Sequence, residues 1–124
     1  MIEFHKLQSE KDELSFLKKY QNETTPEILG YVFAVEMKQA EYTANPFKKL
    51  KIFNTTKKKL NTLIENNPSC VDLRYLRLLL QERTPKILGY DDNIEADKIF
   101  LKNEIDGQKV SVELTKYILK NTSL

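Results

Sequence analysis

The sequence predicts an all-α fold of five to seven helices, packed as antiparallel hairpins in a stack or a compact bundle. The 124 residues include only three glycines and four prolines, so the turn residues needed by many short strands are scarce. Apolar residues recur mostly at helical spacing rather than at every second position. Each proline follows a Thr or Asn, residue types that cap helices well, at Thr25-Pro26, Asn45-Pro46, Asn67-Pro68 and Thr84-Pro85. At least three of these pairs are expected to begin a helix.

Three helices are predicted in the first half of the chain. The first covers residues 9–20 and places Leu14 and Leu17 on one face. The second covers about residues 26–43, and its apolar side chains occupy more than half of the helical wheel, which indicates burial on more than one side. The third covers about residues 46–66, and these apolar residues are expected to face inward: Phe47, Leu50, Phe53, Leu60, Leu63 and Ile64.

Three more helices are predicted in the second half. The fourth covers about residues 71–83, with Ser69 as its expected cap. The short segment 86–93 is expected to form a single turn or short helix that Gly89 stops. The fifth covers about residues 93–106 and the sixth about residues 109–121. Residues 108–113 alternate as a strand would, although no partner strand is evident.

The chain length fits one domain over residues 1–124, of which residues 1–8 could be mobile. Charges are spread through the first residues, so no secretory signal is evident. The longest apolar run, at residues 78–80, is far below the roughly 20 residues that span a bilayer. We therefore expect a cytoplasmic protein with no membrane span, the alternative being an exported protein whose leader is missing from this sequence.

One heptapeptide occurs twice. The stretch TPEILGY at residues 25–31 returns as TPKILGY at residues 84–90, with six of seven residues identical. Two interpretations are open. The pair could descend from a duplicated helical unit, or two segments could have converged on a favourable helix start.

Two resemblances concern the central part of the chain. The stretch LNTLIENNPSCVDLRYLRLLL, residues 60–80, resembles the helix–turn–helix passage of tetratricopeptide (TPR) repeats, which implies a stack of helical hairpins. The blocks NPFKKL (45–50), DLRYLR (72–77), LGY (88–90) and NIEADK (93–98) resemble a group of small uncharacterised Bacteroidota proteins. No activity is implied by the second resemblance.

Composition argues against several function classes. Twenty Lys and Arg against 18 Asp and Glu leave a net charge of +2, which is too balanced for a typical nucleic-acid-binding protein. A single His and a single Cys argue against a metal site and exclude an intramolecular disulfide. No phosphate-binding loop, zinc-protease or nucleophile-elbow motif occurs. We therefore expect no enzymatic activity, no cofactor and no metal.

Arg74, Arg77 and Gln81 form a polar ribbon on the otherwise apolar helix at residues 71–83. A buried guanidinium needs an acidic partner, because an unpaired buried charge costs several kcal/mol. The candidate partners are Glu36, Glu41 and Asp72. The ribbon is either a structural ion-pair network or a groove that binds a carboxylate or phosphate.

A basic face and two tyrosines are further candidate contact residues. Lys48, Lys51, Lys58 and Lys59 share one side of the helix at residues 46–66. These lysines are either a solvated face or a contact for an acidic protein, a nucleic-acid backbone or anionic lipid. No aromatic side chains are expected among them, which disfavours single-stranded nucleic acid. Tyr31 and Tyr90, beside the repeated Leu-Gly pair, are either core-edge residues or binding anchors.

The first functional hypothesis is a non-catalytic protein-interaction or scaffold module. It would bind another protein or a peptide in a groove between the helices near residues 26–43 and 71–83, using Tyr31, Tyr90, Arg74, Arg77 and Gln81. The second hypothesis is an inhibitor or immunity-type protein that occludes its partner. The third is a small anionic-ligand binder that uses Arg74 and Arg77. The sequence leaves a homo-oligomer open.

Overall fold

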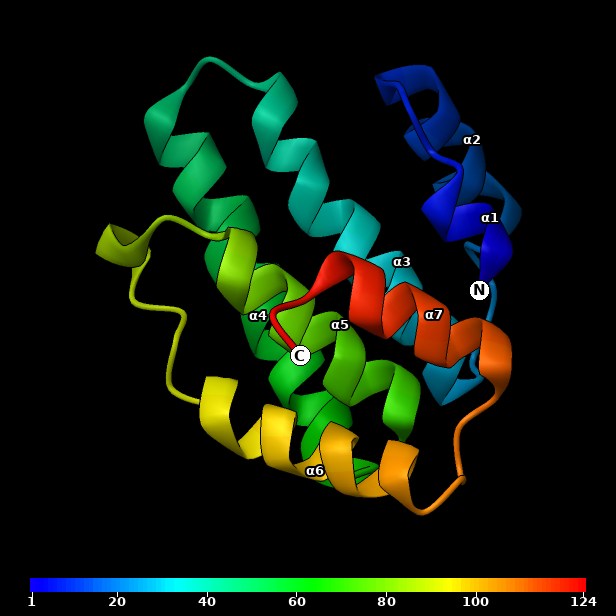
Figure 1. Ribbon diagram of the computed structural model, residues 1–124. Coiled ribbons are helices and arrows are strands. Elements are labelled where there is room, and N and C mark those ends of the chain that lie inside the picture. Colours follow the sequence, from blue (N-terminus) through cyan, green and yellow to red (C-terminus); the bar gives the residue numbers. More distant parts are fainter. The chain divides into compact units, whose positions relative to one another are not determined.

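A computed structural model describes all residues from Met1 to Leu124 and confirms the all-α prediction. The chain forms seven α-helices and two short 3-10 helices, with no strand (Figure 1). Where residues 108–113 suggested a strand, the chain turns with Gln108 at a φ of 56° and then enters a helix. None of the helices is both long and apolar enough to cross a membrane.

The chain divides into two compact units, Met1–Asn67 and Pro68–Leu124, and each is described by itself. Unit 1 contains α1 (Ile2–His5), α2 (Glu10–Lys19), α3 (Pro26–Lys38), the 3-10 helix η1 (Gln39–Tyr42) and α4 (Pro46–Asn66). Unit 2 contains α5 (Val71–Arg83), the 3-10 helix η2 (Lys86–Leu88), α6 (Ile94–Asp106) and α7 (Val112–Asn121).

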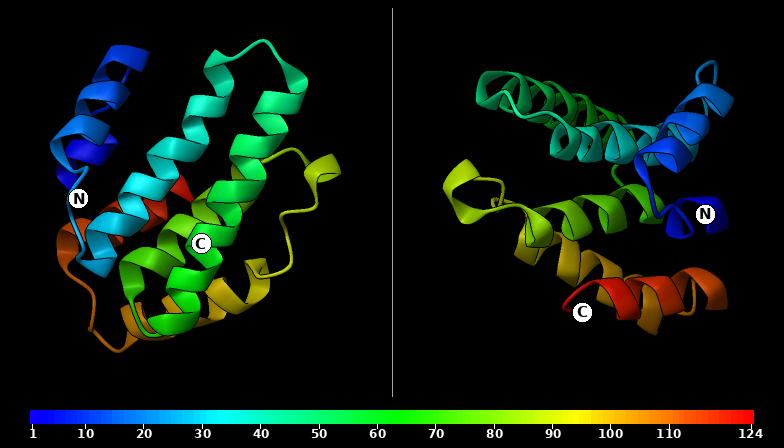
Figure 2. Two further views of the ribbon diagram at one scale, coloured as in Figure 1. Left: turned by 180° about the vertical axis from the view of Figure 1, so that it is seen from behind. Right: turned by 90° about the horizontal axis from the view of Figure 1, so that it is seen from above.

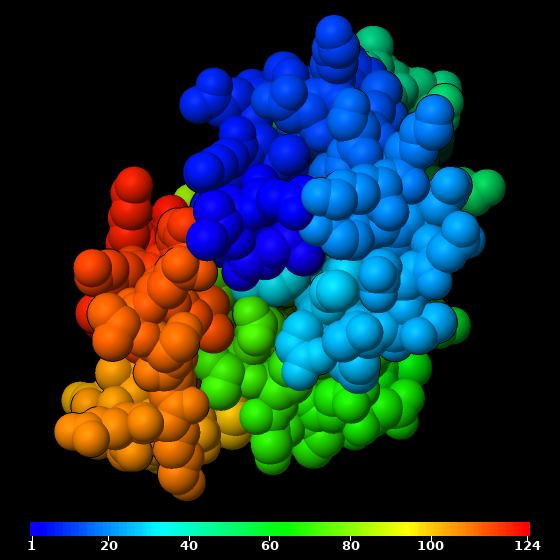
Figure 3. Space-filling view, turned by 90° about the vertical axis from the view of Figure 1, so that its right-hand side faces the viewer, coloured from blue at the N-terminus to red at the C-terminus, as the bar shows by residue number.

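The N-terminal residues of unit 1 are packed. Phe4 of α1 is buried, and its ring lies 5.2 Å from the ring of Tyr31 on α3. Glu3 pairs with Lys19 at the end of α2 at 2.9 Å. In the space-filling view, the darkest blue residues lie directly against the lighter blue surface that follows them in sequence (Figure 3). Residues 1–8 therefore include a short helix with an aromatic anchor.

The inward face of α2 differs from the prediction. Leu14 is exposed, whereas Glu13 and Phe16 are buried. Ser9 caps this helix, because its hydroxyl accepts a hydrogen bond from the Asp12 amide at 3.1 Å. The cap was predictable because it is local, but the buried Glu13 was not.

An antiparallel hairpin of α3 and α4 makes up most of unit 1. The two helices lie side by side and are joined at one end through η1, at the top of Figure 1 and of the left view in Figure 2. Asn45 begins α4 as predicted, since its side-chain oxygen accepts hydrogen bonds from the amides of Phe47 at 3.0 Å and Lys48 at 3.3 Å. The buried stripe of α4 consists of Phe53, Thr56, Leu60 and Ile64.

Three of the four proline pairs stand at the start of a helix, but only two of these helices are α-helices. Pro26 and Pro46 begin α3 and α4, but Pro68 lies before the start of α5 and Pro85 precedes only η2. The cap position of α5 is Cys70 rather than Ser69, and no side chain caps it. The Thr84 hydroxyl instead donates to the Leu80 carbonyl at 2.6 Å, so this threonine belongs to the end of α5.

In unit 2, α5 packs along α6, and α7 attaches to α5. α5 carries most of the buried side chains of this unit. Asn121 at the end of α7 donates a hydrogen bond to the hydroxyl of Tyr75 at 3.1 Å. Between α5 and α6 the chain makes an excursion through η2 that stands away from the helices on either side of it (Figures 1 and 2).

The repeated heptapeptide adopts two different structures. In residues 25–31 it forms the first turns of α3. In residues 84–90 it follows α5, is extended at both Thr84 and Pro85 with a ψ of 136° at each, and reaches Gly89 with a φ of 67°. That left-handed conformation suits glycine because a Cβ atom would be strained there. The two copies are therefore not equivalent structural units.

Candidate functional site

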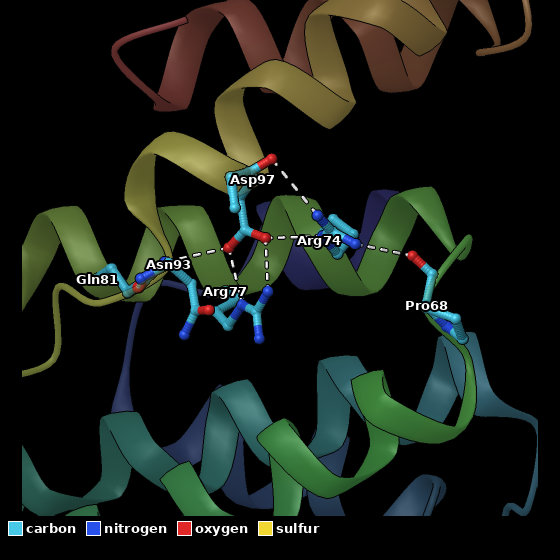
Figure 4. A network of polar contacts seen from close by, with 7 residues as sticks. Pro68, Arg74, Arg77, Gln81, Asn93 and Asp97 are labelled. Carbon is cyan, nitrogen blue, oxygen red and sulfur yellow. Dashed lines mark hydrogen bonds and ion pairs between the residues drawn. The ribbon is translucent and has the colours of Figure 1, made fainter.

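The polar ribbon of α5 surrounds a single carboxylate, that of Asp97 on α6 (Figure 4). Asp97 has no exposed surface. Its Oδ1 accepts hydrogen bonds from Arg74 Nε at 2.7 Å and from Arg77 Nη2 at 2.7 Å. Its Oδ2 accepts from Arg77 Nε at 2.8 Å and from Gln81 Nε2 at 3.1 Å. Four donors therefore fill the roughly four acceptor sites that a carboxylate offers.

The predicted partners of the two arginines were wrong. Glu36 pairs with Lys59 at 2.8 Å, and neither Glu41 nor Asp72 forms a salt bridge with Arg74 or Arg77. The sequence does carry a signal for Asp97: it lies three residues after Ile94 and four before Leu101, on the apolar stripe of α6. A carboxylate on such a stripe must be paired when the helix packs.

The remaining groups of the ribbon also have partners. Arg74 Nη1 donates to the Pro68 carbonyl at 2.9 Å, and its guanidinium lies 4.4 Å from the centre of the Phe100 ring. The oxygen of the Gln81 amide accepts from the backbone N–H of Asn93 at 2.9 Å, which fixes the start of α6. The ribbon thus joins α5 to α6 and leaves little of either guanidinium for an external anion.

Both tyrosines named as candidate anchors are buried. Tyr31 lies against Phe4 in unit 1. Tyr90 is buried in unit 2, and burial raises the pKa of its hydroxyl, with the charges of Arg77 and Asp97 acting in opposite directions. In the structure, Tyr31 and Tyr90 are core residues of their units.

The predicted basic face of α4 is mostly exposed. Lys48, Lys51 and Lys58 are exposed and take part in no salt bridge. Lys59 differs, because it pairs with Glu36 and lies 4.6 Å from the centre of the Phe33 ring. Three of the four predicted lysines therefore form an open basic face, and the fourth helps to join α4 to α3.

The prediction that Phe47 and Leu50 face inward was wrong. Phe47 is 84% exposed and Leu50 is 46% exposed. The buried stripe of α4, continued backwards by four residues from Phe53 and from Thr56, reaches Lys49 and Ile52 and misses Phe47. The first turn of α4 thus carries apolar side chains in the same region as lysines.

A second exposed apolar feature lies in the excursion between α5 and α6. Ile87 on η2 is 93% exposed, and the neighbouring Leu88 is also exposed. The turn is closed by two backbone hydrogen bonds, from Leu88 N–H to the Pro85 carbonyl and from Gly89 N–H to the Lys86 carbonyl, each 3.0 Å. The sequence predicted the turn but gave no signal that Ile87 would point into solvent.

Unit 1 contains a buried carboxylate that the sequence did not single out. Glu13 on α2 is 3% exposed, and it accepts hydrogen bonds from Gln39 Nε2 at 3.0 Å and from the Tyr42 hydroxyl at 2.9 Å. Lys38 Nζ lies 3.8 Å away. Because Glu13 favours the protonated hydroxyl, it raises the pKa of Tyr42 to about 12. The two hydrogen bonds of Glu13 therefore connect α2 to η1.

The hollow along α2 and the acidic side chains of the chain add no further chemical site to those described above. A hollow of about 430 Å³ lies along α2, but all of its lining residues (Glu10, Lys11, Leu14, Ser15 and Lys18) come from that one helix. No group of three or more His, Cys, Asp or Glu side chains is placed to hold a metal ion.

No protein-family model matches this chain, and neither a curated protein nor a solved structure matches it. The resemblances to TPR repeats and to small Bacteroidota proteins therefore remain predictions from the sequence. The candidate contact surfaces rest on the geometry of the two units.

Proposed function

We propose that this chain is a non-catalytic protein-interaction module and that the η2 turn of unit 2 contacts its partner protein. The supporting observation is Ile87, whose side chain is 93% exposed at the apex of a closed turn. Burial of this exposed side chain by a partner would stabilise the complex, because burying an Ile side chain is favourable by about 1.5–3 kcal/mol.

The backbone of the η2 turn supports this proposal because Pro85 and two backbone hydrogen bonds restrain the turn that carries Ile87. Pro85 fixes φ at −54° on one side, and Gly89 adopts a left-handed conformation on the other. A preorganised turn loses little conformational entropy on binding, so more of the contact energy appears as affinity. Ile87, followed by the exposed Leu88, is thus suited to fill a pocket on another protein.

The proposal keeps the predicted class of function and changes the residues. The groove expected between residues 26–43 and 71–83 depended on Tyr31, Tyr90 and the arginine ribbon as anchors, and those side chains are buried or paired. An inhibitor or immunity-type protein would be a special case of the same proposal. Asp97 already occupies the guanidiniums that an anionic ligand would need.

The experiment is affinity purification from the native host with three baits: the wild type, Ile87→Asp and the control Val112→Asp. Val112 is also a strongly exposed apolar residue of unit 2, but it lies on α7. We expect one specific partner with the wild type and with the control, and its loss with Ile87→Asp. Thermal melting should show both variants within about 0.5 kcal/mol of the wild type. Retention of the partner by Ile87→Asp would refute the proposed surface, and repeated failure to recover any partner would refute the function.

A further inference from the structure

The charges of unit 1 are unevenly distributed along the chain. Helix α4 carries six lysines and one acidic residue, Glu65, whereas the whole chain has a net charge of only +2. Between Glu36 and Glu65 the only acidic residue is Glu41. The connected end of the α3–α4 hairpin, at the start of α4, and the outward face of α4 therefore form a region of positive potential.

Apolar groups are exposed at the same end of the hairpin. Phe47 and Leu50 lie one helical turn apart at the start of α4, and the preceding Ala44 and Pro46 are exposed as well. Lys48, Lys49 and Lys51 are interleaved with these residues in sequence and are also exposed. Exposed apolar side chains and exposed lysines therefore occur together in residues 44–51, a segment that we call the hairpin tip.

The acidic groups of unit 1 nearest to this end in sequence or around Tyr42 belong to η1 and α2 rather than to α4. The pKa of Tyr42 is raised first by its hydrogen bond to Glu13, with further contributions from Glu41 and Glu10. These carboxylates lie on η1 and in the first turn of α2. Lys58, by contrast, adds a further exposed lysine on the outward face of α4. Residues 44–51 themselves contain three exposed lysines and no acidic residue, which suits an anionic surface.

We propose that the hairpin tip binds the surface of membranes that contain anionic phospholipids. Phe47 and Leu50 enter the headgroup layer, and Lys48, Lys51 and Lys58 contact lipid phosphates. Interfacial segments combine apolar residues with lysines in this way, and anionic lipids attract such lysines. A nucleic acid would engage the lysines but would leave Leu50 exposed, because an aliphatic side chain offers no face for base stacking. This inference concerns unit 1 and is independent of the partner proposed for unit 2.

The test is sedimentation of the full chain with phosphatidylcholine vesicles, with and without about one third phosphatidylserine. We expect binding only to the vesicles that contain phosphatidylserine, and weaker binding in high salt, because salt screens exposed charges. The variant Lys48→Gln/Lys51→Gln/Lys58→Gln should bind about 100-fold more weakly, since each lysine contributes about fivefold. The variant Phe47→Ser should lose about tenfold.

The matched control is Lys102→Gln/Lys116→Gln/Lys120→Gln, which removes the same charge from exposed positions on α6 and α7. We expect this control to bind the vesicles nearly as well as the wild type. An equal loss in the control and in the α4 variant would mean that net charge alone drives binding, and that result would overturn the proposal. Circular dichroism melting of all variants verifies that they are folded.

A second measurement reports directly on insertion. The chain has no tryptophan, so Phe47→Trp introduces a single probe at the hairpin tip. Its emission should shift to shorter wavelength and be quenched by brominated lipids when phosphatidylserine vesicles are added. The control Ile87→Trp places the probe on η2 and should show neither change. Absence of both changes at position 47 would overturn the insertion of Phe47.

Two further outcomes would assign the hairpin tip to another ligand. Tight binding to poly(U) RNA without binding to anionic vesicles would make the lysines a nucleic-acid contact and overturn the proposal. Binding to neither, together with capture of an acidic protein that depends on Lys48 and Phe47, would likewise replace the membrane by a protein. Inorganic phosphate, added as a competitor, should not displace the chain from vesicles, because it cannot replace the contact with Phe47.

Discussion

Each unit encloses one buried carboxylate, and the two are held by different kinds of partner. Asp97 in unit 2 accepts hydrogen bonds from two guanidiniums and one amide. Glu13 in unit 1 accepts from a neutral amide and a hydroxyl, with the ammonium of Lys38 at 3.8 Å. Both carboxylates join two segments of their unit, α6 to α5 in one case and α2 to η1 in the other.

This difference shows that a buried carboxylate can be stabilised mainly by charge or mainly by hydrogen bonds. In the Asp97 network two cations depend on one anion, so removal of that anion leaves buried positive charge without compensation. Around Glu13 the hydrogen-bonding partners are neutral and Lys38 is partly exposed. Removal of the negative charge of Glu13 therefore leaves no fully buried cation without an acidic partner. The free energy lost on substitution should therefore be larger in unit 2.

Asp97→Asn should have the largest effect. The amide keeps the shape of the side chain but cannot neutralise Arg74 and Arg77, and its NH₂ group is a donor facing donors. We expect the free energy of unfolding to fall by about 3–5 kcal/mol and Tm to fall by more than about 10 °C. Asp92→Asn, at an exposed position before α6, is the control and should change stability by less than about 0.5 kcal/mol. A melting curve of Asp97→Asn that overlays the wild type would contradict the structural role of the network.

Glu13→Gln should have a smaller effect. The amide oxygen can still accept a hydrogen bond from either Tyr42 or Gln39, so only one of the two contacts is lost. We expect a loss of about 1–2 kcal/mol, measured by urea unfolding against the wild type. If Glu13→Gln proved as costly as Asp97→Asn, the contrast between the two carboxylates would be wrong.

The smallest effect concerns the titration of Tyr42. Its pKa is raised to about 12 by the hydrogen bond to Glu13, so the neutral hydroxyl stabilises the folded state. This contribution is fully present below the unfolded pKa of about 10 and is lost as the pH rises through about 12. NMR titration of the tyrosine Cζ resonances should show the pKa of Tyr42 falling toward about 10 in Glu13→Gln.

Tyr75 provides an internal control for that titration. Its pKa is also raised to about 12, but the main cause is burial in unit 2. In Glu13→Gln the Tyr75 resonance should therefore titrate as in the wild type. Equal shifts of both tyrosines would point to a change in folding rather than to the loss of one hydrogen bond.

The sequence predicted what depends on neighbours along the chain. Asn45 and Pro46 begin α4 because an asparagine oxygen caps the next amides and proline needs no hydrogen bond at the first helical position. The helices α5 and α6 were also predicted close to their observed bounds, and the start of α3 was predicted correctly, although α3 ends at Lys38 and gives way to η1 rather than continuing to about residue 43. These features follow from hydrogen bonds and side-chain spacing within one segment.

The sequence failed where packing between segments decides. Ile87 and Ile28 have nearly identical neighbours, yet one lies on an exposed turn and the other within a helix. Similarly, the position of Asp97 on the apolar stripe of α6 signals a buried carboxylate, but only the packing of α6 against α5 shows that it pairs with Arg74 and Arg77. Phe47 was assigned to the core because apolar side chains are usually buried, a rule that fails at contact surfaces.

The Asp97 network also bears on how unit 2 folds. Its hydrogen bonds connect residues only 16 to 23 positions apart, since α6 returns along α5 after the short excursion through η2. Contacts between residues close in sequence require little loop closure, and chains rich in such contacts fold in microseconds to milliseconds. We therefore expect α5 and α6 to pair early in folding, before the C-terminal helix joins them.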